Sequence, residues 1–334
     1  MDFNICVAGA TGNVGRTMIK ILEERNFPVD RIRFLASSRS TGKKLPFRGA
    51  DIAVEELTLD SFEKGELVLS SPGGSVSKWY VPSAVKAGAF VIDNTSAFRM
   101  DDNVPLVVPE VNPEDAHRHQ GVISNPNCST IQMVVVLKPI HDIAKIRRVV
   151  VSTYQAVSGA GIAAIDELRE QSKAIIEGGG YEPRVFPHQI AFNCLPQIPQ
   201  SNAFGPNLYS EEEMKMVNET RKIMNDPSIL ITVTTVRVPV FTSHSESVNV
   251  ETERKITRDE AVDALKKAPG VTVLDDPSSG IYPLASEAEG KDDTFVGRIR
   301  EDISHDRALD MWIVSDNLRK GAALNAVQIA ELFL

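Results

Sequence analysis

Short apolar stretches alternate with helical patterns through the first third of the chain, and this alternation is the strongest constraint on the fold. The stretches that predict strands are 3–8, 32–36, 67–70 and 90–93, and those with helical spacing are 14–24 and 76–87. Strands that alternate with helices form βαβ units, whose strands lie parallel in one sheet. We therefore predict an N-terminal α/β domain built on a parallel sheet.

A glycine-rich segment, Gly9-Ala10-Thr11-Gly12-Asn13-Val14-Gly15, joins the first predicted strand to the first predicted helix. Glycines in this place let the backbone turn tightly and approach a pyrophosphate, which the helix N-terminus then binds. The spacing is G-x-x-G-x-x-G, and an ordinary tight turn is the alternative that the segment alone leaves open. Its position predicts a Rossmann-like dinucleotide site, with cofactor contacts from Gly9, Thr11, Gly12, Asn13 and Val14.

The segment after the second predicted strand bears on which dinucleotide binds. An NAD site usually has an acid there, which binds the 2′-hydroxyl of the ribose. This chain has Ser37-Ser38-Arg39-Ser40 and no acid, followed by Lys43 and Lys44. A 2′-phosphate would be bound by Arg39 and the neighbouring hydroxyls, whereas a carboxylate would repel it. We therefore predict NADP as the cofactor, bound by Ser38, Arg39 and Ser40. At least one of the two lysines is expected to belong to a solvated loop.

The pattern changes in the second half of the chain. Long β-branched stretches cover 148–156, 229–240 and 247–252, and helical stretches cover 161–176 and 210–224. This predicts an α+β catalytic and dimerisation domain, with helices on one face of a mixed or antiparallel sheet. Residues 317–334 have helical spacing, and we expect this C-terminal helix to return to the first domain. The predicted boundaries are 1–128, completed by 315–334, and 129–314.

Composition limits the classes of function. The 334 residues suit two domains, and a formal charge of −9 disfavours nucleic acid as a partner. Three cysteines without metal-type spacing indicate a reducing compartment and no metal site, so we expect a cytoplasmic protein. The apolar runs are too short to span a membrane, and the N-terminus lacks a signal-peptide pattern.

Cys128 is the best candidate for covalent chemistry. It lies in Asn125-Pro126-Asn127-Cys128-Ser129-Thr130, between a strand-like stretch and an apolar run. This context places a thiol at a helix N-terminus, where unpaired N–H groups and the helix dipole favour the thiolate. A buried structural cysteine is the alternative, and for a lone cysteine it is the commoner one.

Two further residues support a catalytic reading. Arg237 ends a predicted apolar strand, where a buried guanidinium requires an anion such as a substrate carboxylate. His244 opens the next strand and could transfer protons to and from the thiolate and the product oxygen. A structural role for His244 stays an alternative, and its partnership with Cys128 favours catalysis.

Five motifs together resemble the aspartate-β-semialdehyde dehydrogenase family, and the resemblance runs essentially end to end. These motifs are Gly9–Gly15, Asn94–Arg99, Asn125–Thr130, Ser152–Gly161 and Arg237–His244. The resemblance implies an oxidoreductase that reduces β-aspartyl phosphate with NADPH to aspartate semialdehyde and phosphate. That reaction belongs to the biosynthesis of lysine, threonine, methionine and diaminopimelate.

The resemblance also assigns roles to single residues. It implies that Cys128 is the nucleophile, His244 the acid/base, Gln155 the residue that orients the substrate beside the sulfur, and Arg237 the ligand of its α-carboxylate. For the remaining site residues it implies an amino-group contact from Glu212, phosphate contacts from Arg99, Asn127 and Lys215, and nicotinamide contacts from Ser158, Gly159 and Asn317. The Glu212 and Lys215 assignments depend on helix register, because Glu219 and Lys222 repeat the same spacing.

Other readings stay open. N-acetyl-γ-glutamyl-phosphate reductase performs the same thioester reduction, but its cysteine motif differs from this one. Glyceraldehyde-3-phosphate dehydrogenase also differs around the cysteine and usually takes NAD. A non-catalytic NADP-binding homologue would have no need of Cys128, Gln155, Arg237 and His244 together. We expect a homodimer through the sheet of the second domain, and a tetramer is left open.

Overall fold

The computed structural model describes residues 3–334, which form two compact units. The first unit comprises the chain up to Asn127 together with Ala322–Leu334, and the second comprises Cys128–Gly321. Within residues 3–334, no helix is both long and apolar enough to cross a membrane. The described part of the chain also holds no group of three or more acidic, histidine or cysteine side chains placed to bind a metal ion.

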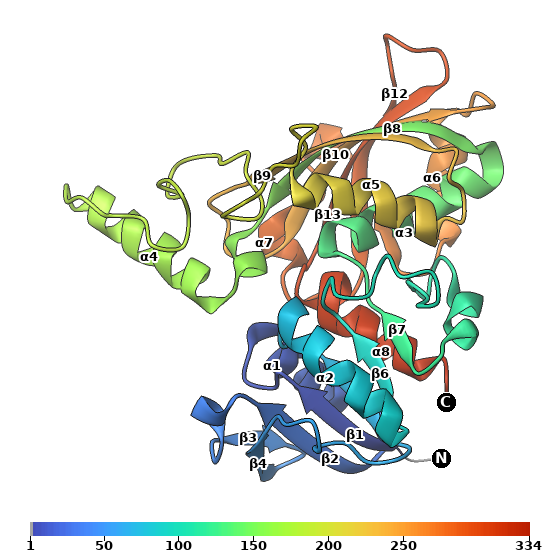
Figure 1. Cartoon of the computed structure of the whole chain (residues 1–334). Coiled ribbons are helices and arrows are strands. Elements are labelled where there is room, and N and C mark those ends of the chain that lie inside the picture. Colours follow the sequence, from blue (N-terminus) through green and yellow to red (C-terminus); the bar gives the residue numbers. More distant parts are fainter. Residues whose placement is uncertain (1–2) are drawn as a thin grey trace. The chain divides into compact units, whose positions relative to one another are not determined.

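The first unit is built on a seven-stranded sheet with the order β3-β4-β2-β1-β5-β6-β7 (Figure 1). The strands are β1 (Phe3–Ala8), β2 (Val29–Ala36), β3 (Lys44–Phe47), β4 (Ala50–Glu56), β5 (Leu67–Ser70), β6 (Phe90–Asp93) and β7 (Val122–Ser124). All neighbours pair in parallel except β3, which forms an antiparallel edge with β4. The predicted Rossmann-like parallel sheet is therefore confirmed, and the β3–β4 hairpin is an addition to it.

Helices cover both faces of this sheet. Helix α1 (Asn13–Glu24) and the C-terminal helix α8 (Leu324–Glu331) share one apolar core with β1, β2 and β5. Helix α2 (Gly74–Ala87) buries Tyr80, Val81 and Ala84 in the core on the other face. The predicted return of the C-terminal helix to the first domain is confirmed. Its helical stretch is shorter than 317–334, since α8 is preceded by a π-helical turn over Arg319–Ala323.

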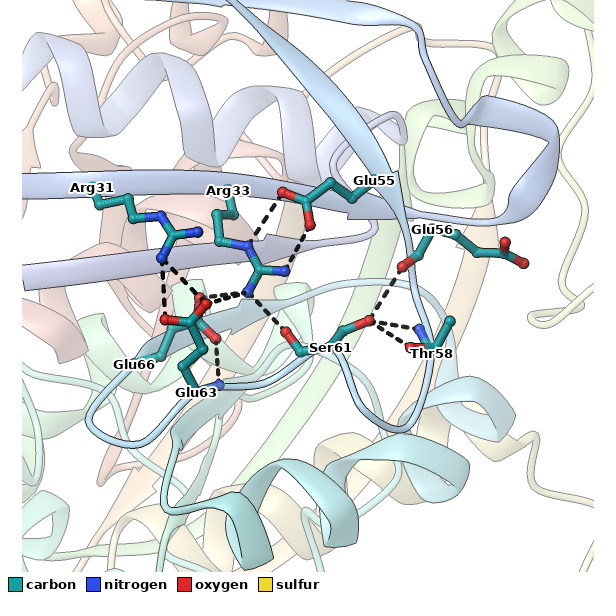
Figure 2. Close-up of polar contacts among 8 residues, drawn as sticks. All are labelled: Arg31, Arg33, Glu55, Glu56, Thr58, Ser61, Glu63 and Glu66. Carbon is teal, nitrogen blue, oxygen red and sulfur yellow. Dashed lines mark hydrogen bonds and ion pairs between the residues drawn. The ribbon is translucent and has the colours of Figure 1, made fainter.

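A cluster of charged residues connects β2 and β4 with the segment before β5 (Figure 2). Arg33 of β2 makes two hydrogen bonds to Glu55 of β4, a third to Glu66, and a fourth to the carbonyl of Ser61. The hydroxyl of Ser61 in turn donates to the carbonyl of Glu56 at 3.2 Å. This cluster fixes the backbone at the carboxyl end of β4, while the Glu56 side chain points away from it.

The second unit is built on a six-stranded mixed sheet with the order β11-β12-β13-β10-β8-β9. Its strands are β8 (Ile146–Gln155), β9 (Leu230–Arg237), β10 (His244–Thr252), β11 (Val271–Val273), β12 (Thr294–Glu301) and β13 (Ala308–Ser315). The outer pairs β8–β9 and β11–β12 are parallel, and the inner pairs are antiparallel. The predicted mixed sheet with helices on one face is confirmed for the long helices, whereas the short α7 (Ala285–Ala288) packs on the other face. The sequence pattern did not predict β11, β12 and β13.

Three helices pack on one face of the mixed sheet. The central helix α3 (Cys128–Ala144) contacts β8, β10, β12 and β13, and it is flanked by α5 (Glu211–Ile223) and α6 (Arg258–Lys267). The other helices of this unit are α4 (Ile162–Ile176) and the short α7 (Ala285–Ala288). Because successive strand residues alternate between faces, one row of each strand points to α3 and α5 and the other row points away. The row under the helices contains the candidate catalytic residues.

Candidate active site

Cys128 is the first residue of α3 and is partly exposed. Its Sγ lies 3.2 Å from Nε2 of His244, the first residue of β10. A Cβ added to Gly321 would lie 2.9 Å from the Cβ of Cys128, so glycine is needed at this close approach. The structure thus brings the two candidate catalytic residues into contact, at a helix N-terminus as the sequence predicted.

His244 is completely buried, with none of its surface exposed. The preceding residue, Ser243, has a φ of 72°, and this left-handed turn starts β10 at the imidazole. Nδ1 of His244 accepts a hydrogen bond from the backbone N–H of Ala156 at 3.0 Å. Burial, and after it the positive charge of Arg237, hold the pKa of His244 well below its ordinary value. Both effects disfavour the charged imidazolium form of the ring.

Arg237 ends β9 and is 4% exposed. Its Nη1 donates to the carbonyl of Ala156 at 2.7 Å, and its Nε has no hydrogen-bond partner among residues 3–334. Burial lowers the pKa of Arg237, and the acidic groups of Glu212 and Cys128 oppose this effect. A buried guanidinium with an unused donor is a binding group for an anion.

Gln155 and Glu212 lie beside Arg237. Gln155 ends β8 and is the direct ladder partner of Arg237 in β9. The Gln155 side-chain amide donates to Glu212 at 3.4 Å, and Glu212 is 6% exposed near the start of α5. Lys215 lies 3.6 Å from Glu212 and 2.8 Å from Glu211. A capping box, in which the side chains and backbone N–H groups of Ser210 and Glu213 bond reciprocally, fixes the start of α5.

The three predicted nicotinamide contacts lie near His244. The Asn317 amide donates to Ser158 Oγ at 3.0 Å, and its oxygen accepts from the N–H of Ser243 at 2.9 Å. A Cβ added to Gly159 would lie 3.5 Å from Nε2 of His244. Ser158, Gly159 and Asn317 are therefore gathered around the turn that presents the imidazole.

Two predicted phosphate contacts belong to the first unit. Arg99 is 7% exposed, and its guanidinium donates to the carbonyls of Asn125 and Asn94, each at 2.9 Å. Asn127 is the last residue of the first unit before Cys128 and is 7% exposed. Lys215, the third predicted phosphate contact, belongs to α5 of the second unit.

A pocket of about 560 Å³ opens at the carboxyl ends of β1, β2, β4 and β5 in the first unit. Its lining residues are Gly9, Thr11, Gly12, Ala36, Ser37, Ser38, Arg39, Glu56, Leu57, Ser71, Pro72, Val76 and Trp79. Five of the predicted cofactor contacts are among them. Of the other predicted contacts in this unit, Asn13, Val14 and Ser40 do not belong to the lining, although Ser40 Oγ lies 3.5 Å from Thr11 Oγ1.

The glycine loop fits a dinucleotide by its own geometry. A Cβ on Gly15 would lie only 2.3 Å from the carbonyl oxygen of Gly9, so α1 can approach the loop this closely only with glycine. The N-cap of α1, Gly12, makes no side-chain capping bond, which leaves the first N–H groups of the helix for a ligand. The buried amide nitrogen of Asn13 also has no partner among residues 3–334.

Sequence reasoning missed two acidic residues. Glu56 reaches the pocket from β4, because β4 lies next to β2 in the sheet, and no local sequence pattern shows that these strands are neighbours. Glu246 lies two residues after His244 in β10 and is completely buried, with no hydrogen-bond partner for either carboxyl oxygen among residues 3–334. Burial raises the pKa of Glu246 well above its ordinary value.

Two family profiles match the chain. The profile described as semialdehyde dehydrogenase, NAD binding domain, matches residues 4–119. The profile described as semialdehyde dehydrogenase, dimerisation domain, matches residues 137–320.

Individual relatives agree with the profiles. Aspartate-semialdehyde dehydrogenase of Aquifex aeolicus is 55% identical to this chain, and the match covers 100% of this chain and 98% of the relative. The enzyme of that name from Bacillus subtilis is 52% identical, and the match covers 98% of this chain and 96% of the relative. The crystal structure of aspartate semialdehyde dehydrogenase II from Vibrio cholerae has a TM-score of 0.95 at 49% identity, and covers 100% of this chain and 98% of its own. The site geometry, both profiles and these full-length similarities show that the chain belongs to the aspartate-semialdehyde dehydrogenase family, whose members are oxidoreductases that act on an aldehyde.

Proposed function

We propose that this protein catalyses the NADPH-dependent conversion of β-aspartyl phosphate into aspartate semialdehyde and inorganic phosphate, through an acyl-thioester on Cys128. The observation that carries the proposal is the 3.2 Å contact between Sγ of Cys128 and Nε2 of His244, beside the buried Arg237. This reaction would serve the biosynthesis of lysine, threonine, methionine and diaminopimelate in the cytoplasm.

Cys128 would attack the acyl carbon of the substrate and expel phosphate. The resulting thioester accepts a hydride more readily than a carboxylate does, so covalent catalysis divides one difficult step into two easier ones. The N–H groups at the start of α3, with the amide of Asn127, would stabilise the oxyanion that forms. His244 would govern the proton nearest the sulfur throughout these steps.

The substrate would be bound by its two charged ends. Arg237 would bind the α-carboxylate through the nitrogen atoms that are not used by Ala156, including Nε. Glu212 would bind the amino group, and Gln155 would orient the acyl group, since its amide is already fixed by Glu212. Buried partners suit this task because charge-assisted hydrogen bonds are strongest where water is excluded.

The phosphate group would be bound by Arg99, Asn127 and Lys215. Arg99 and Lys215 are cations whose side chains are mostly sheltered from solvent, and phosphate favours such partners. Since the chain carries a formal charge of −9, anionic substrates must be attracted by such placed cations rather than by the overall field.

The dinucleotide would occupy the pocket of the first unit, and when bound it would supply the hydride. Gly9, Thr11 and Gly12 would contact its pyrophosphate, and Arg39 with Ser38 would bind the 2′-phosphate that distinguishes NADP. Asn13, Val14 and Ser40 stay proposed contacts at the rim of the glycine loop, and Ser158, Gly159 and Asn317 would contact the nicotinamide. A related structure from Candida albicans, with a TM-score of 0.75 and 25% identity, is described as a complex with NADP.

A homodimer is proposed through the face of the mixed sheet opposite α3, α5 and α6, on which the short α7 packs at β13. This face carries Val150, Ser152 and Tyr154 of β8 and Trp312 of β13, with the Tyr154 and Trp312 rings 5.4 Å apart. Aromatic residues are enriched at such interfaces. Light scattering on the purified protein is expected to give twice the chain mass of 36.5 kDa, and a fourfold mass would indicate a tetramer instead.

The reaction itself is tested by nicotinamide absorbance in the oxidative direction. Aspartate semialdehyde, N-acetylglutamate semialdehyde and glyceraldehyde 3-phosphate are each offered with phosphate and with NADP⁺ or NAD⁺. The proposal expects phosphate-dependent turnover of aspartate semialdehyde with a preference for NADP⁺. Turnover of another aldehyde in preference would reject the substrate, and no turnover at all would favour a non-catalytic homologue.

A further inference from the structure

A buried carboxylate on α4 binds three successive backbone N–H groups. Glu167 is buried, and its Oε2 accepts hydrogen bonds from the N–H groups of Arg184 at 2.8 Å and Val185 at 2.6 Å. Its Oε1 accepts a third from the N–H of Phe186 at 3.3 Å. Residues 184–186 belong to no helix or strand, so a side chain of α4 accepts the hydrogen bonds that secondary structure accepts elsewhere.

Gln171 extends this arrangement by one helical turn. It is completely buried, and its Oε1 accepts hydrogen bonds from the N–H groups of Ile190 at 2.9 Å and Ala191 at 3.1 Å. Its amide donates to Oε1 of Glu167 at 3.4 Å, which orients both side chains. Residues four apart lie on the same face of a helix, and this pair therefore fixes the segment 184–191 at both of its ends.

The segment fixed by Glu167 and Gln171 packs against the turn that carries two of the proposed nicotinamide contacts. A small apolar core joins this segment to α4 and to Val157, which directly precedes Ser158 and Gly159. The buried residues of this core are Val157, Ala164, Leu168, Phe186, Ile190, Ala191 and Leu195. The irregular segment and the nicotinamide turn are therefore packed together within the second unit.

The same segment continues to Leu195, which pairs with Arg237. The N–H of Leu195 donates to the carbonyl of Arg237 at 2.9 Å, and the N–H of Arg237 donates to the carbonyl of Leu195 at 2.8 Å. Strand β9 is the last strand of its sheet, so Leu195 provides the backbone partner on its open side. Gln155 of β8 is the ladder partner on the other side. The backbone of Arg237 is thus held between a regular strand and the segment that Glu167 orders.

The guanidinium of Arg237 has little room for movement. Its Nη1 donates to the carbonyl of Ala156 at 2.7 Å, and a Cβ added to Gly159 would lie 3.1 Å from the same nitrogen. A bidentate contact requires both nitrogens of the fork to point at the carboxylate. A displacement of about 1 Å, even from a distant change, can cost about 100-fold in rate. The order of the segment that ends at Leu195 therefore bears on how well Arg237 binds an anion.

We propose that Glu167 is a positioning residue for the substrate carboxylate. Through residues 184–195 it holds the backbone of Arg237 where the guanidinium can bind that group. The inference rests on the function proposed above, because it concerns the same carboxylate site. The groups that react at the sulfur belong to α3 and β10, outside the segment that Glu167 orders. Loss of Glu167 therefore raises the KM for the carboxylate-bearing substrate and leaves kcat nearly unchanged.

Steady-state kinetics test this role. Glu167→Ala removes all three hydrogen bonds, whereas Glu167→Gln keeps one acceptor oxygen for the N–H groups of Arg184 and Val185. We expect the KM for aspartate semialdehyde to rise about tenfold in the Ala variant and about threefold in the Gln variant, with kcat within about twofold of wild type. Glu170→Ala is the matched control, since Glu170 is exposed on the same helix and accepts from the hydroxyl of Tyr181. An unchanged KM in both Glu167 variants, or a loss confined to kcat, would overturn the proposal.

A double-mutant cycle with Arg237→Ala separates positioning from general destabilisation. If Glu167 acts through the guanidinium, Glu167→Gln should lower kcat/KM about threefold in the wild-type background and leave it unchanged where Arg237 is already alanine. A purely structural role would lower kcat/KM by the same factor in both backgrounds. Equal factors would therefore contradict the positioning role.

Hydrogen exchange followed by mass spectrometry measures the order of the segment without any substrate. In Glu167→Ala the amides of residues 184–195 should exchange about tenfold faster or more, while those of α3 and β10 keep their wild-type rates. Unchanged exchange in 184–195 would reject the proposal, and so would faster exchange without a rise in KM. The proposed function fails on a different result, the absence of aspartate semialdehyde turnover by the wild-type protein.

Discussion

Gly159 approaches Arg237 so closely that a Cβ at position 159 would lie 3.1 Å from Nη1. Such a contact is tighter than normal van der Waals packing, so the guanidinium would have to shift. Because Arg237 is expected to bind the substrate carboxylate, Gly159→Ala is predicted to raise the KM for aspartate semialdehyde by about tenfold. This corresponds to a loss of roughly 1.4 kcal/mol in binding free energy. Steady-state kinetics measure this. Gly180→Ala, where an added Cβ meets nothing within 4 Å, should leave KM unchanged.

Cys128→Ser tests the covalent route. A hydroxyl is a far weaker nucleophile than a thiolate at neutral pH, so kcat should fall by roughly 10⁴- to 10⁶-fold, as it does for other lost nucleophiles. Binding of NADPH should be unchanged, because the pocket belongs to the first unit. Cys194→Ser, at an exposed cysteine, is the control. Substantial activity in Cys128→Ser would contradict an acyl-enzyme.

Arg237→Lys tests the carboxylate site. Lysine keeps the charge but loses the planar fork, so it cannot replace both the bond to Ala156 and a bidentate contact with the substrate. A hydrogen bond to a charged group contributes about 1.5–3 kcal/mol, and the predicted rise in KM is therefore roughly 10- to 150-fold. The exposed Arg147 offers the same substitution as a control. An unaltered KM would remove Arg237 from this role.

The buried carboxyl group of Glu246 should make the free energy of unfolding depend on pH. Burial raises its pKa in the folded protein, so its contribution is fully present below the unfolded pKa and declines as pH rises toward the folded pKa. Glu246→Gln removes the ionisable group and keeps the size, and is expected to raise the free energy of unfolding at pH 8 more than at pH 5. Urea unfolding at both pH values measures this, with exposed Glu289→Gln as the control. An equal effect at both pH values would show that Glu246 does not titrate on unfolding.

Substitutions of Arg39 and Glu56 should have opposite effects on the preference for NADP over NAD. Both line the nucleotide pocket, and one would attract a 2′-phosphate while the other would repel it. Arg39→Ala should weaken binding of 2′,5′-ADP by about tenfold or more and change binding of 5′-AMP little, since a charged hydrogen bond contributes about 1.5–3 kcal/mol. Glu56→Gln should strengthen binding of 2′,5′-ADP relative to 5′-AMP. Calorimetric titration measures the dissociation constants of both ligands. An equal change in the two constants would contradict a role of the substituted residue in selectivity.

The elements with a clear local sequence pattern could be predicted, and the elements without one could not. The strand before Gly9 and the helix after it have clear periodicity, and both match β1 and α1 closely. The β12 and β13 strands were missed because charged residues interrupt them, such as Arg298 and Arg300 in β12 and Asp310 in β13. Their pairing depends on neighbours far away in the sequence, which local propensity does not report.

In the candidate site, too, the features with a local sequence pattern were predicted and those that depend on distant parts of the chain were not. Cys128 and His244 were identified from their local contexts, and the structure joins them although 116 residues separate them. The hydrogen bond at Nδ1 of His244 could not be predicted, because its donor is the backbone N–H group of Ala156. Glu56 was missed for a similar reason, since only the sheet order brings the end of β4 to the pocket. Sequence motifs carry side-chain chemistry, whereas backbone donors and strand order appear only in the folded chain.

The glycine loop belongs to the first unit. The second unit, Cys128–Gly321, contains the candidate residues for covalent chemistry and substrate binding, which are Cys128, Gln155, Glu212, Arg237 and His244. A lesion confined to the glycine loop would therefore spare His244, whose imidazole contacts the sulfur of Cys128. Under the proposed mechanism, such a protein is expected to load its cysteine with the aspartyl group and to be unable to discharge it by reduction. Intact-mass spectrometry would detect the stalled adduct, so the first half of the catalytic cycle can be observed without the second.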